Sequence, residues 1–261
     1  MNLPRASFVN FVSKTAETMF FWHFPLVFAR KTQIYPMFIT PYIDIHTHDG
    51  TDEENVTKVV CLSHDDEAIA EGLYCTAVHP WALDDEAMDI DRAMAAVKRK
   101  AAADNMAAVG ETGIDRTHKD TVERQTKAFR RHIALAEELR KPLIIHSVRA
   151  TSDILALHKA LKPTQAWVMH GFNGNEQEIR QLTDAGICIS AGEAIMHDER
   201  HITKALHCIP ADRLFLETDT WDGSIRTIYK RAAELLKTDE EALREIIFAN
   251  FARITNNRYT R

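Results

Sequence analysis

The chain contains 261 residues, of which 45% are hydrophobic and 27% charged, and its formal net charge is −6. This composition is that of an ordinary globular protein, and nine glycines and eight prolines exclude a collagen-like or low-complexity chain. The acidic balance argues against a dominant basic surface for nucleic acid. Thirteen histidines are many for this length, so they are the compositional feature that needs an explanation.

Residues 1–36 are interpreted as an N-terminal extension outside the main fold. Residues 20–29 are strongly apolar but contain His23 and Pro25, and they are about half as long as a membrane-spanning helix. A basic start and a small-residue cleavage site, the marks of a secretory signal, are not found there. Met37 stands just before the first predicted strand, so we expect one domain at residues 37–261 and no membrane span. An interfacial N-terminal helix is the alternative.

The four cysteines form no CxxC pair and have no zinc-ribbon spacing; they are Cys61, Cys75, Cys188 and Cys208. Few scattered cysteines in a chain of this size predict a reduced, cytoplasmic protein. Three of them lie inside apolar runs, where a cysteine usually packs as a small hydrophobic side chain.

Short apolar runs alternate with longer helical patterns after Met37. Most runs are continuously apolar, which is typical of strands buried on both faces of a parallel sheet. The runs are Tyr42–Ile45, Val59–Leu62, Leu73–Val78, Ala107–Val109, Leu143–Ile145, Ala166–Met169, Ile187–Ile189 and Leu214–Leu216.

Three helices are predicted to begin with a cap residue followed three positions later by glutamate. The cap pairs are Asp120 with Glu123, Asn175 with Glu178, and Thr238 with Glu241. The first helix covers residues 121–140, and the second ends at Gly186. His132 and His158 lie in predicted helices, where we expect solvated or partly buried faces.

Eight strands joined by crossovers predict a TIM-like (β/α) barrel of seven or eight parallel strands. An open, doubly wound sheet is the alternative. Residues 47–58 and 63–72 leave room for only a turn or a short helix each, so the first crossovers are expected to be shortened.

Imidazole and carboxylate side chains stand at the ends of five apolar runs. They are His46 and His48, Glu111, His146, His170, and Asp219. Because the carboxyl ends of barrel strands open on one face, these side chains are expected to meet there. Side chains alternate along a strand, so the two imidazoles of the HxH pair point the same way. Six such ligands favour two divalent ions, about 3.5–4 Å apart, over one.

The motifs YIDIHTH, AVHP, VGETGID, IIHS, HGFNG and LETD occur in this order. Together they resemble the TatD family of metal-dependent deoxyribonucleases in the amidohydrolase superfamily, over roughly Tyr42 to Ile254. The resemblance implies a TIM-like barrel that binds two ions of Zn, Mn, Mg or Co. It further implies that His46, His48, Glu111 and Asp219 hold one ion, and that Glu111 bridges to a second ion completed by His146 and His170.

The implied activity is cleavage of phosphodiester bonds at the 3′ end of DNA by a metal-activated hydroxide. Glu111 and Asp219 would be catalytic, with Asp219 also a general base. His79 matches a family position near the site and is expected either to contact substrate or to pack. Glu217 is expected either to orient a ligand histidine or to form a salt bridge beneath the barrel mouth. DNA is the implied partner, and no protein partner is implied.

Three loops depart from the family pattern. The segment after HxH is short, Arg116-Thr117-His118 stands where aromatic residues are common, and Thr220-Trp221-Asp222 lacks a usual proline. No metal ligand is lost, but the loops that would hold the substrate differ. Two alternatives therefore stay open: an amide, ester or lactone hydrolase of the same superfamily, and a non-catalytic metal-binding protein.

Overall fold

The computed structural model describes residues 39–260. The predicted extension at residues 1–36 lies outside these residues, so it stays a prediction. Within residues 39–260 no helix is long and apolar enough to cross a membrane. The cytoplasmic location likewise stays a prediction.

Eight parallel strands pair in chain order, each beside the next. They are β1 (Tyr42–Thr47), β2 (Val56–Ser63), β3 (Leu73–Ala77), β4 (Met106–Asp115), β5 (Leu143–Val148), β6 (Trp167–Met169), β7 (Cys188–Ala191) and β8 (Leu214–Leu216). The loop after β8 closes on β1, because Asp219 N donates to His46 O at 3.0 Å and His48 N donates to Asp219 O at 2.9 Å. The strands thus form a nearly closed barrel, which confirms the predicted fold over the open sheet.

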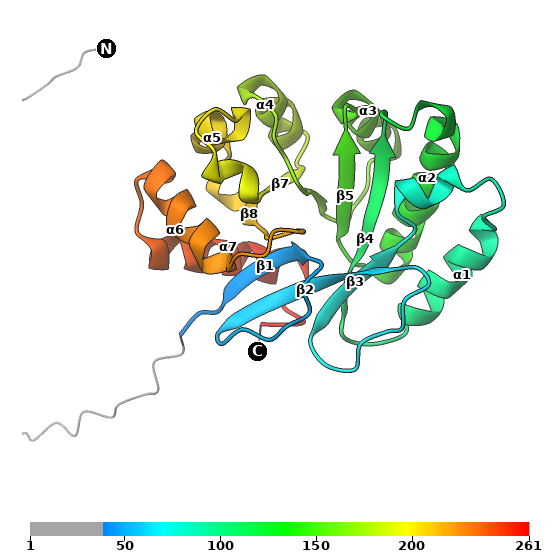
Figure 1. Ribbon diagram of the computed structural model, residues 1–261, viewed down its shortest axis with the longest axis horizontal. Helices are drawn as coiled ribbons and strands as arrows, with labels where there is room; N and C mark the ends of the chain where they lie inside the picture. The colour runs from blue at the N-terminus through cyan, green and yellow to red at the C-terminus, as the bar shows by residue number, and fades with distance from the viewer. Residues whose placement is uncertain (1–38, 261) are drawn as a thin grey trace, which may run out of the picture. The chain divides into compact units, whose positions relative to one another are not determined.

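Helices cover the outside of most strands, whereas β2 lies on a side without a covering helix and is mostly half-buried (Figure 1). The helices are α1 (Ile90–Lys100), α2 (Val122–Leu139), α3 (Thr151–Leu161), α4 (Glu176–Asp184), α5 (His201–Ala205), α6 (Ile225–Leu236) and α7 (Glu240–Ile254). Short 3₁₀ helices occupy Pro80–Asp84, Lys119–Thr121, Glu193–Met196, Leu206–Cys208 and Ala211–Arg213. No helix lies between β1 and β2 or between β2 and β3, so the predicted shortening of the first crossovers is confirmed.

Continuous burial explains why most strand sequences are apolar without alternation, although in β2 only Val59 is buried. Every residue of β1 and β4 is buried, since their outer faces pack against helices and their inner faces fill the barrel. Phe129 and Ala136 of α2 are fully buried, as their helical spacing predicts. The polar residues of β1 and β4 are therefore buried, with few water contacts.

The helix ends show where local pattern and structure differ. The box of Asn175 and Glu178 is formed as predicted, with both side chains bonded to the backbone. The prediction at Asp120 is wrong, because a 3₁₀ turn continues to Thr121 and α2 begins at Val122 without a side-chain cap. The last helix is capped by Asp239, whose carboxylate accepts from two backbone amides, one residue after the predicted Thr238.

His132 of α2 is fully buried, which corrects the expectation of a solvated or partly buried face. Its Nε2 accepts from Val78 N at 3.1 Å, and its Nδ1 lies 2.9 Å from Ala128 O and 3.1 Å from Thr112 Oγ1. Burial lowers the pKa of His132 to about 4, so the imidazole is neutral and can accept from Val78. His132 therefore links α2 to the backbone of Val78, which precedes His79, and to the side chain of Thr112, which follows Glu111.

Acidification is expected to weaken the fold through His132. In the unfolded chain His132 takes up a proton as pH falls below about 6.5, whereas the folded protein does not take it up until about pH 4. The stability contribution of the neutral imidazole is therefore present above pH 6.5 and is lost as pH falls toward 4. We expect wild type to lose about 2 kcal/mol more than His132→Gln between pH 7 and pH 5. Urea unfolding of both metal-free proteins measures the difference, and parallel pH curves would contradict the assignment.

Candidate metal centre

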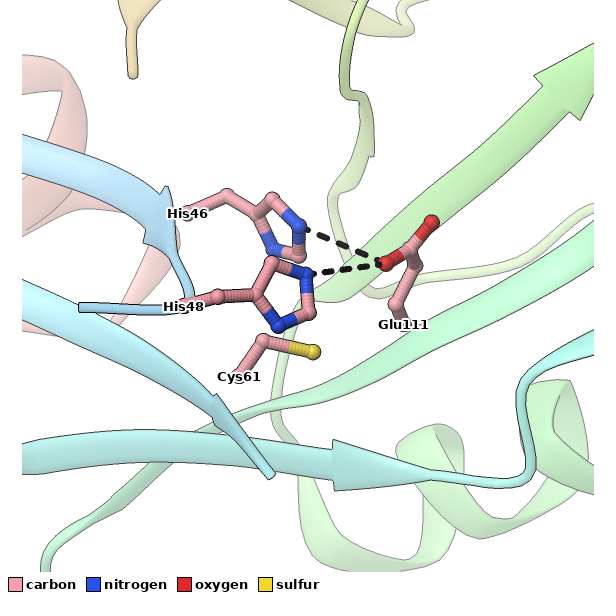
Figure 2. Close-up of side chains that lie close together, drawn as sticks. All are labelled: His46, His48, Cys61 and Glu111. Atoms are coloured by element: carbon pink, nitrogen blue, oxygen red, sulfur yellow. Dashed lines mark ion pairs between the residues drawn. The ribbon is translucent and has the colours of Figure 1, made fainter. Parts of the chain in front are cut away.

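The structure brings all six sequence-predicted ligand residues to the carboxyl end of the barrel. His46 lies in β1 and His48 follows it, Glu111 is in β4, His146 is in β5, His170 follows β6, and Asp219 follows β8. Figure 2 shows the rings of His46 and His48 directed at the Glu111 carboxylate. Glu111 is only 5% exposed, whereas the side chains of His48 and Asp219 are 43% and 35% exposed. The cluster is therefore buried on the Glu111 side and open to solvent on the other.

The two carboxylate oxygens of Glu111 face different histidines. Oε2 lies 3.4 Å from His46 Nε2 and 3.8 Å from His48 Nε2. Oε1 lies 2.6 Å from His146 Nδ1 and 2.7 Å from His170 Nε2. This division is the geometry of a carboxylate that can hold one ion with each oxygen.

Asp219 belongs to the group on the Oε2 side. Its Oδ1 lies 3.5 Å from His46 Nε2 and 3.6 Å from His48 Nε2. The donor atoms of His46, His170 and Asp219 also lie within 4.8 Å of one another. Asp219 is thus close to both halves of the cluster.

Opposite charges set the protonation of the cluster. Burial would raise the pKa of Glu111, but the charge of His170 and the hydrogen bonds of the histidines hold it well below its ordinary value. Burial would lower the pKa of His170, yet the Glu111 charge raises it to about 10. Glu111 is therefore ionised with imidazolium partners, and a divalent cation can replace their protons.

His46 supplies a direct test of whether a cation fits. Its side chain is completely buried, and neither ring nitrogen has a hydrogen-bond partner among residues 39–260. A buried polar nitrogen without a partner costs free energy, and Nε2 is directed at two carboxylates. Imidazole nitrogens and carboxylate oxygens suit divalent ions such as Zn²⁺, so the residues present fit a metal.

Two buried carboxylates lie behind the ligand histidines. Asp115 Oδ2 is 3.3 Å from His146 Nε2, and Glu217 Oε1 is 3.6 Å from His170 Nδ1. Carboxylates in this position fix the ring orientation of metal-binding histidines. The position of Glu217 favours its predicted orienting role over a salt bridge beneath the mouth. Asp115 was missed, although it lies on the Glu111 face of β4 by strand alternation.

His79 contacts Glu111, and one donor atom from each of His79, Glu111 and His146 lies within 4.8 Å of the other two. Trp81 N donates to His79 Nδ1 at 3.2 Å, so the ring proton is on Nε2, which lies 3.1 Å from Glu111 Oε1. In this tautomer Nε2 donates a hydrogen bond to Glu111 Oε1. His79 therefore helps to satisfy Glu111, and it also packs edge-on against His146.

A buried hydrogen-bond network holds the loop that carries Asp219. Thr218 donates to Asp44 twice, from its backbone N at 3.0 Å and from Oγ1 at 2.6 Å. Asp44 is fully buried in β1, and this burial raises its pKa to about 7. Asp219 itself has a left-handed φ of 54°, a conformation that costs free energy in a residue other than glycine. The Asp44–Thr218 contacts therefore position the carboxylate that follows them.

The remaining histidines of the segment after β7 lie outside these groups. His197 pairs with Glu193 at 3.4 Å, His201 begins α5, and His207 lies with Cys208 and Glu176 in an exposed group. Cys61 is a second residue that the sequence analysis missed, since its place in an apolar run predicts a small hydrophobic side chain. Its thiol lies with His46, His48 and Glu111 (Figure 2).

Comparison with known proteins matches residues 45–256 to the family described as TatD related DNase. The chain is 30% identical over 174 residues to the uncharacterized metal-dependent hydrolase YcfH of Escherichia coli (strain K12), covering 60% of this chain and 66% of that protein. It is 35% identical over 130 residues to the 3′-5′ ssDNA/RNA exonuclease TatD of Erwinia tasmaniensis, covering 48% and 50%. The matches thus span between half and two thirds of these relatives.

The fold has solved counterparts. The crystal structure of YjjV, a TatD homolog from Escherichia coli K12, aligns with a TM-score of 0.68 at 20% identity over 84% of this chain and 99% of that one. A TatD family hydrolase from Entamoeba histolytica aligns with a TM-score of 0.66 at 14% identity, with the same coverage. At these identities the likeness shows the fold alone.

Glu111→Gln is expected to abolish metal binding, because it removes the charge that faces the four predicted ligand histidines and His79 while keeping the side-chain shape. Elemental analysis of the purified protein measures the metal-to-protein ratio. Glu193→Gln is a matched control, since Glu193 is an exposed glutamate paired with a single histidine. Equal metal content in wild type and Glu111→Gln would contradict the assigned site.

Proposed function

The chain belongs to the TatD related DNase family, and from this premise we propose that it is a two-metal hydrolase that cleaves phosphodiester bonds at the 3′ end of DNA. Metal-dependent hydrolase is the description of YcfH, and the Erwinia relative is named as an exonuclease on single-stranded DNA and RNA. The observation that carries the proposal is the division of Glu111, with one oxygen toward His46 and His48 and the other toward His146 and His170.

Two donor sets follow from this division. His46, His48, Glu111 Oε2 and Asp219 would hold one divalent ion, and Glu111 Oε1, His146 and His170 would hold the other. Bound ions of Zn, Mn, Mg or Co would lower the pKa of water and polarise the phosphoryl oxygens. Asp115 and Glu217 would keep the rings of His146 and His170 in place.

Asp219 is the residue best placed to accept a proton. Burial would raise the pKa of Asp219, but the nearby ring of His46 and the charge of His170 lower it, so the carboxylate is ionised. It is also 35% exposed, so substrate and water can reach it. A general base of this kind contributes about 10²–10⁴-fold to a rate.

Asp219→Asn is expected to lower kcat on single-stranded DNA by about 10²–10⁴-fold, because the amide cannot accept the proton. Asp222→Asn is the matched control, since Asp222 is an exposed carboxylate three residues further along the same loop. Oligonucleotides labelled at the 5′ end report stepwise shortening from the 3′ end, with and without chelator. Cleavage that survives both the chelator and Asp219→Asn would refute the proposed mechanism.

An amide, ester or lactone hydrolase is the second candidate function. The observation that favours it is the lack of helices between β1 and β2 and between β2 and β3, because these connections border the site and differ from the family pattern. A panel of small esters, lactones and amides, tested beside DNA at saturating metal, separates the two. Intact DNA with turnover of a small substrate would favour this candidate, and bound metal without any turnover would favour a binding protein.

Trp81 offers an exposed aromatic surface beside the proposed ligands. Its side chain is 54% exposed, and its Nε1 donates to Asp115 Oδ2 at 2.7 Å. The ring stacks on His118 with centroids 5.7 Å apart and lies 5.9 Å from the His146 ring. Aromatic side chains held in this way bind unpaired bases by stacking. Trp81 therefore supports a single-stranded nucleic acid as the substrate.

Trp81→Ala is expected to raise the KM for single-stranded DNA by about 5- to 150-fold, the equivalent of about 1–3 kcal/mol per stacked base. Trp81→Phe keeps an aromatic face but loses the hydrogen bond to Asp115. We expect Trp81→Phe to keep most of the DNA affinity. Its kcat should fall, because Asp115 loses a hydrogen bond that holds it against His146. An unchanged KM in Trp81→Ala would show that no base stacks there.

A further inference from the structure

Cys61 lies in β2 next to the histidines that end β1, and the proposed ligand sets leave it out. The two strands pair in register at Thr47 and Val60, so His48 and Cys61 come next to each other. Cys61 is half-buried, in contrast to Cys75, its register partner in β3, which is fully buried. Cys75 thus lies in the core behind Cys61, whereas Cys61 lies at the edge of a polar cluster.

Four donor atoms of four different residues gather here. One atom from each of Cys61, His46, His48 and Glu111 lies within 4.8 Å of every other. Figure 2 shows the Cys61 sulfur beside the His48 ring. His46 gives an independent sign of a ligand, because it is completely buried and its ring nitrogens have no hydrogen-bond partner among residues 39–260.

We propose that the thiolate of Cys61 is a fourth ligand of the ion held by His46, His48 and Glu111. The inference rests on the proposed metal site, and it adds a ligand that the family resemblance does not imply. On binding, the S–H bond breaks, its proton leaves to solvent and a metal–sulfur bond forms. Two imidazoles, a carboxylate and a thiolate form a donor set that favours Zn²⁺ or Co²⁺ and disfavours Mg²⁺.

A sulfur ligand changes the role of Asp219. In the donor set above Asp219 completes the first ion, and here Cys61 takes that place, while Asp219 stays near His46 and His170. With Cys61 in the fourth position, the partly exposed Asp219 carboxylate is left to accept a proton. In this arrangement Cys61 binds the ion, and Asp219 accepts the proton.

Absorption spectroscopy of the cobalt-loaded full chain tests the proposal. Cys208→Ser serves as the parent protein, because Cys208 lies with His207 and Glu176 in a second group that contains a thiol. The parent is expected to show the near-ultraviolet charge-transfer band of a cobalt–thiolate bond. Adding Cys61→Ser should abolish the band, and adding Cys188→Ser, a control at a buried cysteine of β7, should leave it unchanged. Zinc affinity should fall at least about tenfold in Cys61→Ser, with magnesium affinity nearly unchanged.

Bound cobalt without the band in the parent, or a band that survives Cys61→Ser, overturns the proposal. If Cys61→Ser does not fold, alkylation of the parent followed by mass spectrometry decides, since zinc must protect Cys61. A parent that binds no metal overturns both this proposal and the proposed function. A cobalt–thiolate band without DNA cleavage supports the Cys61 ligand and refutes only the nuclease activity.

Discussion

Burying the Glu111 carboxylate inside the barrel costs several kcal/mol unless cationic groups or donors face both of its oxygens. The partners come from β1, from β5 and from the residues after β3 and β6, so the ends of distant strands must converge on one point. In the metal-free protein, imidazolium protons balance this charge. Divalent ions would balance it better, because they would also use the unpartnered nitrogen of His46.

The surroundings of Glu111 are held by contacts that reach outward from the barrel. His132 links α2 to Val78 and Thr112, next to His79 and Glu111. Gln125 of the same helix bonds to the backbone N and O of Asp115 at the end of β4. On the other side, Asp44 and Thr218 join β1 to the loop after β8. Helix packing and site geometry are thus coupled, so substitutions beneath the mouth should disturb both stability and metal binding.

Strand positions were predictable because burial on both faces leaves a continuous apolar run, as in β4 and β5. The HxH pair was predictable because alternation along a strand is local geometry. Helix starts were less predictable: at Asp120 the chain forms a 3₁₀ turn, and Asp239 takes the cap expected at Thr238. The burial of His132 could not be predicted from the local sequence, because it depends on the contacts of α2 with Val78 and Thr112.

The sequence by itself determined the alternation of buried strands and helices and the kinds of side chain at the strand ends, since strand period, crossover length and strand-end residues are properties of short segments. The tertiary structure decided that the sheet closes into a barrel. Only the tertiary structure decided which oxygen of Glu111 faces which histidine, that Asp115 supports His146, and that Cys61 joins the group of His46 and His48. The physical reason is strand register. The register shifts in the β1–β2 and β4–β5 pairs, together with the closure of the barrel at Asp219, decide which side chains from distant parts of the chain come into contact.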